Sequence, residues 1–80
     1  MNLHVDLINR GPLSKREGEI LIHLGAGQTR EQIADELHRS RHTISRHVEH
    51  IAEKLHAHNQ TEIVASAIAR HLIEILNTSD

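Results

Sequence analysis

A set of polar side chains between residues 41 and 55 has the types and the spacing for hydrogen bonding to the edges of DNA bases. The Arg46 guanidinium could make two parallel hydrogen bonds to guanine, and the Ser45 hydroxyl can donate or accept. The Glu49 carboxylate would accept from the amino group of cytosine and repel phosphate, which favours selective contacts over general affinity. At about 100° per residue the set lies on one side of a helix, opposite an apolar stripe. Its members are His42, Ser45, Arg46, Glu49 and His50.

A second group of polar residues flanks this surface and could bind phosphate oxygens, which would fix how the helix sits on a duplex. Part of the group stands at the start of the preceding predicted helix, where backbone amides also point outward. The pattern alone fits equally well an ordinary surface helix whose alternating charges keep the protein soluble. The group consists of Gln28, Thr29, Arg30, Arg41, Thr43, His47 and Lys54.

Four helices are predicted to position these residues, and capping signals mark where each begins. Ser14 and Glu17 can form a capping box, in which the hydroxyl accepts from the Glu17 amide and the carboxylate accepts from the Ser14 amide. Similar signals recur at residues 29–32, at Ser40 and at residues 59–62. Residues 1–12 alternate polar and apolar side chains but give only a weak pattern, and we expect no strand in the chain. The predicted helices span residues 15–24, 30–38, 41–55 and about 60–76.

The composition restricts the classes of protein that this chain can represent. Eighty residues make one domain, and without cysteine it has neither a disulfide framework nor a thiolate metal site. The absence of Phe, Tyr and Trp leaves no platform for stacking unpaired bases, and the formal net charge of -2 argues against coating nucleic acid by charge alone. Residues 1–12 resemble neither a secretory signal nor a membrane span, so we expect a cytoplasmic protein without a membrane partner.

Nine histidines are scattered along the chain, and they raise three possibilities. Paired histidines at 38 and 42, 47 and 50, and 56 and 58 make a zinc or nickel site conceivable, but neither cysteine nor carboxylate completes a set, so we expect no metal and no cofactor. Histidine and carboxylate pairs such as His50 and Glu53 lack a nucleophile elbow or phosphate loop, which argues against an enzyme. Protonation of His42, His47 and His50 would instead add positive charge to the DNA-binding side, and we expect DNA affinity to rise as the pH falls toward about 6.

Motifs along the four predicted helices closely resemble the LuxR-type (GerE and FixJ-like) helix-turn-helix DNA-binding domain. The match runs from about Leu13 to Ile73 with correct spacing and no gaps, which makes it more specific than any capping motif. The residues that carry it are Leu13-Ser14-Lys15-Arg16-Glu17, Gly27, Glu31-Gln32-Ile33-Ala34-Asp35-Glu36-Leu37, Ser40, Thr43-Ile44, His47, Ile51, Lys54-Leu55 and Thr61-Glu62.

The resemblance implies an all-α, four-helix fold with a recognition helix at 41–55. It also implies a two-fold dimer, formed mainly through the fourth helix, on a pseudo-palindromic DNA site. Carried over by position, Ser45, Arg46 and Glu49 would face base edges, and Thr43 and His47 would contact the DNA backbone. The chain departs from the pattern at Ser45, where lysine is common, at Glu49, where a basic or polar residue is frequent, and at Arg39, which replaces an aliphatic residue. These departures leave the target sequence open.

The end of the chain departs from the pattern as well, because His71 replaces a glycine found in many relatives. We therefore expect the fourth helix to continue to about Leu76 as a long dimerisation helix. Its apolar residues cover a wider arc than one core requires, which favours a partner, although deeper burial would explain the same pattern. The predicted dimer interface is Val64, Ala65, Ile68, Leu72 and Ile75. The predicted organisation is an N-terminal arm or short helix at 1–12, the DNA-binding domain at 13–76 and a polar tail at 77–80.

Two functions compete at this point. The first is a transcription regulator that binds double-stranded DNA as a homodimer at a specific sequence. The second is an interaction module that forms a heterodimer with a related regulator through the fourth helix, with Glu49 and Glu53 discouraging DNA. The two differ in their sensitive residues, since the first depends on Arg46 and the second on Ile68 or Leu72.

Overall fold

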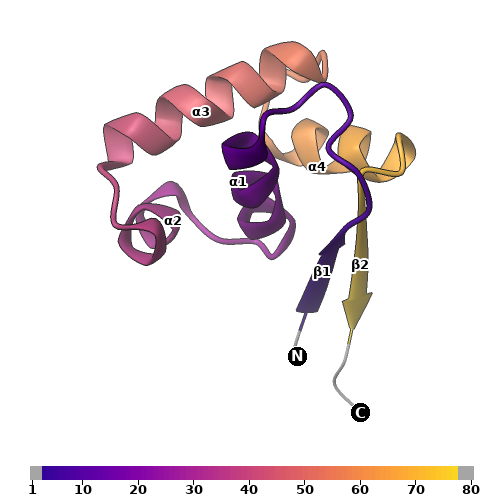
Figure 1. Ribbon diagram of the computed structural model, residues 1–80, viewed down its shortest axis with the longest axis horizontal. Helices are drawn as coiled ribbons and strands as arrows, with labels where there is room; N and C mark the ends of the chain where they lie inside the picture. Colours follow the sequence, from indigo (N-terminus) through magenta and orange to yellow (C-terminus); the bar gives the residue numbers. More distant parts are fainter. Residues whose placement is uncertain (1–2, 78–80) are drawn as a thin grey trace.

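Two short strands join the beginning and the end of the chain beside four helices (Figure 1). The computed structural model describes residues 3–77. The strands pair antiparallel, with Leu3 opposite Asn77 and Leu7 opposite Ile73. In chain order the elements are β1 (Leu3–Leu7), α1 (Lys15–Gly25), α2 (Arg30–Leu37), α3 (Arg41–Lys54), α4 (Gln60–Ala69) and β2 (Ile73–Asn77).

Each helix begins at the capping residue that the sequence predicts. The Ser14 hydroxyl accepts from the Glu17 amide at 3.2 Å while the Glu17 carboxylate accepts from the Ser14 amide at 2.8 Å. The box at residues 29–32 forms in the same way, and Ser40 and Asn59 cap α3 and α4. Each side chain satisfies an amide that has no partner inside its helix, which fixes the first turn.

The helix ends share one hydrogen-bond arrangement, in which a residue with left-handed backbone closes the last turn. After α4, the His71 amide donates to Ile68 O at 3.0 Å and the Leu72 amide donates to Ala67 O at 2.8 Å. This pair of bonds is the Schellman motif, which normally has glycine at the left-handed position. Glycine fills that position only after α1, at Gly27, whose φ is 82°. The other three helices use His38, His56 and His71, with φ of 54°, 54° and 59°.

The expected long fourth helix is wrong, because α4 ends at Ala69 and residues 73–77 form β2. The expectation took the loss of a glycine at position 71 as a sign that the helix continues. His71 instead adopts the conformation that glycine would have. Histidine is among the residues that tolerate positive φ more readily, so the stop signal survives the substitution.

The expectation of a chain without strands is also wrong, since β1 lies within the segment expected to be an arm or a short helix. The strand packs closely on α1 at Gly25, where an added Cβ would lie 3.1 Å from Val5 Cγ1 and 3.2 Å from Ile73 Cδ1. The predicted polar tail begins at Asn77, which is the last residue of β2, and residues 78–80 lie outside the described part of the chain.

One hydrophobic core joins all four helices to the strand pair. It is built from aliphatic side chains because the chain has no aromatic residue. Burying such side chains stabilises the fold by about 1.5–3 kcal/mol each. The buried hydrophobic residues are Leu13, Ile20, Leu21, Leu24, Ile33, Ala34, Ile44, Val48, Ile51, Leu55, Ile63, Ala67, Leu72 and Ile73.

Candidate nucleic-acid interface

Helix α3 lies along one side of the molecule, with α2 before it and α1 beneath it (Figure 1). Its apolar stripe is buried, since Ile44 and Ile51 are 0% exposed and Val48 is 2% exposed. The opposite side is therefore held toward solvent by packing. A short connection around Arg39 and Ser40 joins it to α2, which is the arrangement of a helix-turn-helix.

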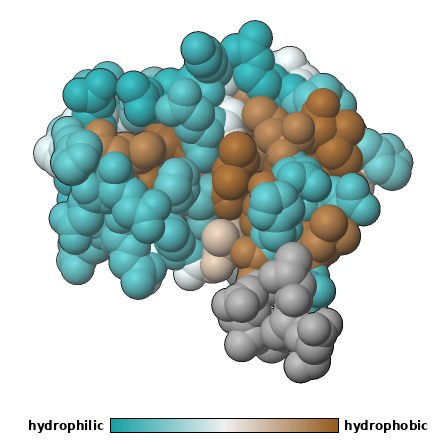
Figure 2. All heavy atoms as spheres, turned by 60° about the horizontal axis from the view of Figure 1, so that its bottom comes forward, coloured by the Kyte–Doolittle hydropathy of each residue, from teal (hydrophilic) through white to brown (hydrophobic). Residues whose placement is uncertain are grey.

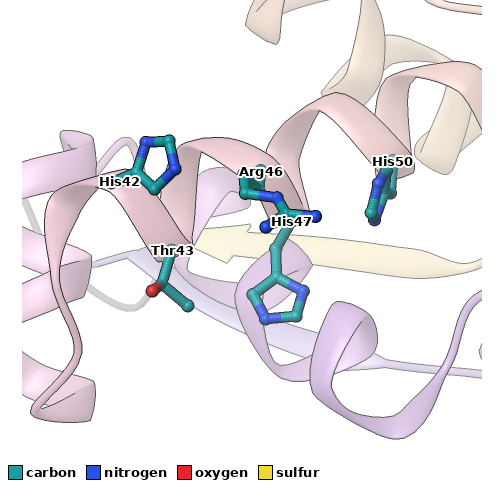
Figure 3. Close-up of a pocket in the computed structure, with 5 residues that line it drawn as sticks. All are labelled: His42, Thr43, Arg46, His47 and His50. Atoms are coloured by element: carbon teal, nitrogen blue, oxygen red, sulfur yellow. The ribbon is translucent and has the colours of Figure 1, made fainter.

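Five polar side chains of α3 line a hollow of about 250 Å³ on the solvent side. Figure 3 shows His42, Arg46 and His50 along one edge of the helix, with Thr43 and His47 on its flank. The hollow thus joins three of the predicted base-edge residues to two of the predicted phosphate residues. The remaining two base-edge residues, Ser45 and Glu49, lie outside it, and Ser45 is half-buried whereas Glu49 is exposed.

A second hollow, of about 460 Å³, lies where the first turns of α2, α3 and α4 meet. It collects four of the predicted phosphate residues, together with Glu31 and Gln60. Arg41 Nη1 lies 3.6 Å from Glu31 Oε1, with both side chains largely exposed. Such a pair contributes little to stability, so an anion could replace the glutamate as the partner of Arg41. The four predicted residues are Gln28, Thr29, Arg30 and Arg41.

The side chain of Gln28 is held by two neighbours rather than directed freely at solvent. Its Oε1 lies 2.8 Å from His23 Nδ1, and its Nε2 donates to Glu36 Oε1 at 3.0 Å. The carbonyl of Gln28 also accepts from Gln60 Nε2 at 3.4 Å. A phosphate contact from the Gln28 side chain must therefore break this network, whereas Arg30 has no such constraint in the described residues.

Lys54 holds the carboxyl-terminal turn of α3 against α1. Its Nζ donates to Glu17 Oε1 at 2.7 Å, and the Glu17 side chain is 5% exposed. Burial raises the pKa of Glu17, but the hydrogen bonds from Lys54 and from the Ser14 amide outweigh it, so the pKa lies below its usual 4.5. The amine of Lys54 is thus already paired, and its predicted phosphate contact competes with this pair.

The sequence does not predict two contacts between helices that hold α3 and the start of α2 in place. Glu17 was identified as a helix cap, but its second role as the partner of Lys54 joins residues 37 positions apart in the chain. Gln60 was seen as part of a capping signal, and its reach to the start of α2 depends on how α4 packs. Helix-local signals carry no information on such contacts between helices.

Hydrophobic side chains gather on the half of the molecule that holds α4 and the strand pair, whereas the half around α2 is mostly hydrophilic (Figure 2). Three predicted dimer-interface residues, Val64, Ala65 and Ile68, line an apolar hollow of about 460 Å³ there. Ile68 is 45% exposed. The expectation for Leu72 is corrected, because that side chain is 3% exposed within the chain's own core. Ile75 lies half-buried on β2 rather than on a helix.

Within residues 3–77, no helix is both long enough and apolar enough to cross a membrane. No group of three or more histidine or carboxylate side chains in the same residues is arranged to hold a metal ion.

Comparison with known proteins places this geometry among bacterial regulators. Residues 11–67 match the family described as "Bacterial regulatory proteins, luxR family". The chain is 35% identical over 63 residues to the uncharacterized transcriptional regulatory protein YxjL of Bacillus subtilis (strain 168). It is 34% identical over 62 residues to the HTH-type transcriptional regulator MalT of Vibrio campbellii (strain ATCC BAA-1116).

Among solved structures, the chain is similar to the response regulator ChrA of a heme-sensing two-component system, with a TM-score of 0.73 and 38% identity. The match covers 75% of this chain and 30% of ChrA. The matches to YxjL and MalT cover 79% and 78% of this chain but 29% and 7% of those proteins. The likeness therefore concerns one domain of longer proteins, and both strands lie outside the residues that match the family.

Proposed function

This chain belongs to the luxR family of bacterial regulatory proteins, and from that premise we propose that it regulates transcription by binding specific sequences of double-stranded DNA through α3. The single observation that carries the proposal is the side of α3 opposite the core, where basic and polar side chains lie together in one hollow. A helix held in this way can enter the major groove, where every base pair presents a distinct pattern of donors and acceptors.

The proposed division of roles follows the positions of the side chains. Arg46 makes two hydrogen bonds to guanine, and Ser45 and Glu49 select neighbouring bases, with His42 and His50 beside them. Thr43 and His47 on the flank of α3 hold phosphates, as do Arg30 and Arg41 at the second hollow. Such contacts fix the position of α3 along the duplex, so that each base-contacting side chain faces a particular base pair.

The protein binds as a dimer in this proposal, with the outer surface of α4 as the contact between copies. Val64, Ala65 and Ile68 leave an apolar hollow there, and contiguous apolar surface of this kind is typical of interaction sites. A two-fold dimer places two copies of α3 in successive major grooves, so the DNA site should be pseudo-palindromic. Ile68 is the central residue because it also borders the adjoining hollow at Ile8, His71 and β2.

The proposal is tested by selecting bound duplexes from a random pool at near-physiological salt and measuring the affinity of the best one. Arg46→Ala should weaken that affinity by about 1–3 kcal/mol and relax the preference at one base pair. Arg10→Ala is the matched control, since it removes the same charge from an exposed residue before α1 that lines neither hollow. If the two variants lose equal DNA affinity, Arg46 contributes only its general positive charge, and base readout by Arg46 is contradicted.

The exposed Ile68 also supports a second candidate, an interaction module that binds a related regulator instead of DNA. Failure to enrich any sequence, together with loss of the heterodimer in Ile68→Glu but not in Arg46→Ala, would favour this candidate. For the DNA-binding regulator, Arg46→Ala instead weakens binding to the enriched duplex, relaxes the preference at one base pair and leaves dimerisation unchanged.

A further inference from the structure

Three histidines of α3 stand apart from the other histidines because they border the proposed DNA-binding hollow without a carboxylate partner. His42, His47 and His50 all line that hollow beside Arg46. Within residues 3–77, carboxylate pairs form at other histidines. They are His4 with Asp6 at 2.7 Å, His23 with Glu36 at 3.3 Å and His58 with Glu62 at 3.0 Å.

The remaining three of the nine histidines have a structural role that explains their presence. His38, His56 and His71 supply the left-handed backbone that ends α2, α3 and α4. Six histidines are thus accounted for by carboxylate pairs or by helix ends. Only the three on the solvent side of α3 have neither role within the described residues.

The charged groups around these three histidines leave them available to an anion. Glu17 of α1 is engaged with Lys54, and Glu31 of α2 with Arg41. Directly after α4, Arg70 Nη2 donates to the carbonyl of Leu55 at 3.5 Å. The turn before α3 adds His38 and Arg39, both exposed. On α3 itself Glu49 and Glu53 are exposed, and neither forms an ion pair with a histidine in residues 3–77.

We propose that His42, His47 and His50 take up protons when the protein binds DNA, so that its DNA affinity rises as the pH falls from about 8 to about 6. The inference rests on the proposed function, because DNA supplies the negative charge that stabilises the imidazoles, through a phosphate at His47 and through the negative potential of the groove at His42 and His50. A neutral histidine donates one hydrogen bond, whereas a protonated one donates two and carries a charge. Three added charges are substantial for a chain whose formal net charge is -2 with its histidines neutral.

The expected size follows from linkage between protons and binding. Uptake of one proton changes the binding constant by about tenfold per pH unit. We therefore expect the Kd to fall at least about tenfold between pH 7.5 and pH 6.0, with more than one histidine contributing. Each imidazolium that neutralises a phosphate also steepens the dependence of log K on log salt by about 0.9.

The experiment measures Kd by fluorescence anisotropy at several pH values and constant ionic strength, on the duplex enriched from the random pool and on the unselected pool itself. The test variant carries His42→Gln, His47→Gln and His50→Gln, with the three single variants alongside. The control carries His4→Gln, His58→Gln and His71→Asn, since asparagine tolerates the positive φ at position 71. Circular dichroism confirms that each variant is folded at every pH used.

The proposal requires that the test variant lose most of the pH dependence and that the control keep it. A Kd that is flat with pH for the unaltered chain, or a pH dependence that survives in the test variant, overturns the proposal while leaving DNA binding intact. If the unaltered chain binds neither the enriched duplex nor the unselected pool between pH 5.5 and pH 8, the proposed function and this inference are overturned together. The single variants show whether one histidine or the group is responsible.

Discussion

Replacing the left-handed histidines by glycine should stabilise the protein, which is unusual for the removal of whole side chains. His38, His56 and His71 have φ between 54° and 59°, and all three side chains are exposed. Their rings therefore contribute little buried area, and the backbone conformation dominates the effect. The bonds that close each turn come from backbone atoms, so they persist after substitution to glycine.

The magnitude combines two opposing effects. A left-handed conformation costs an L residue about 1–2 kcal/mol, which glycine avoids. Glycine loses more backbone entropy on folding, which returns about 0.5–1 kcal/mol. Each change should therefore raise the free energy of unfolding by about 0.5–1 kcal/mol, equivalent to about 2–8 °C in Tm for a domain of this size. The three sites lie in different turns, so their effects should add.

The assay is urea unfolding followed by circular dichroism at about pH 8, where histidine is mostly neutral. Gly27→His provides the reverse change, because Gly27 has φ of 82° and nothing lies within 4 Å of an added Cβ. It should lower the free energy of unfolding by a similar amount. If Gly27→His leaves the free energy of unfolding unchanged, and the three glycine variants do so as well, the backbone argument is refuted.

The remaining predictions concern the ion pair between Lys54 and Glu17, which joins α3 to α1, and the buried side chain of Leu72. Lys54→Met should cost about 1–3 kcal/mol, because it leaves the Glu17 carboxylate buried with one donor fewer. Glu17→Gln should cost less, since an amide oxygen can still accept from Ser14 as Gln32 does at Thr29, and a double-mutant cycle in urea should show coupling. Burial raises the pKa of Glu17 but the Lys54 and Ser14 bonds set it below 4.5, so this stabilisation is present above about pH 4.5 and lost as the pH falls through the folded value. Glu17→Gln should accordingly unfold with a weaker dependence on acid, and an unchanged dependence would contradict that assignment. Leu72→Ala should cost about 2–5 kcal/mol by thermal unfolding whereas Ile68→Ala costs much less, and similar losses would contradict the burial difference between them.

The sequence by itself determined where every helix begins and which side of α3 faces the core. These features depend on groups three or four residues apart, such as the Ser14 hydroxyl and the Glu17 amide, or on the period of Ile44, Val48 and Ile51. The resemblance to the luxR family rests on the same local motifs, and the comparisons confirm it. The roles of individual side chains at DNA remain predictions.

Only the tertiary structure decided how the chain ends are used. The wide apolar arc after residue 63 was compatible with a long helix facing a partner, but Leu72 and Ile73 instead complete the core and β2 pairs with β1. Residues 3–7 do alternate apolar and polar side chains, but each strand gains its hydrogen bonds from a partner 66–74 residues away in the sequence, so neither segment alone shows that the two pair. The same holds for His71, whose left-handed backbone stops α4, and for Lys54, whose partner lies on α1. Contacts distant in sequence set these outcomes, because their free energy depends on packing that exists only after the helices have assembled.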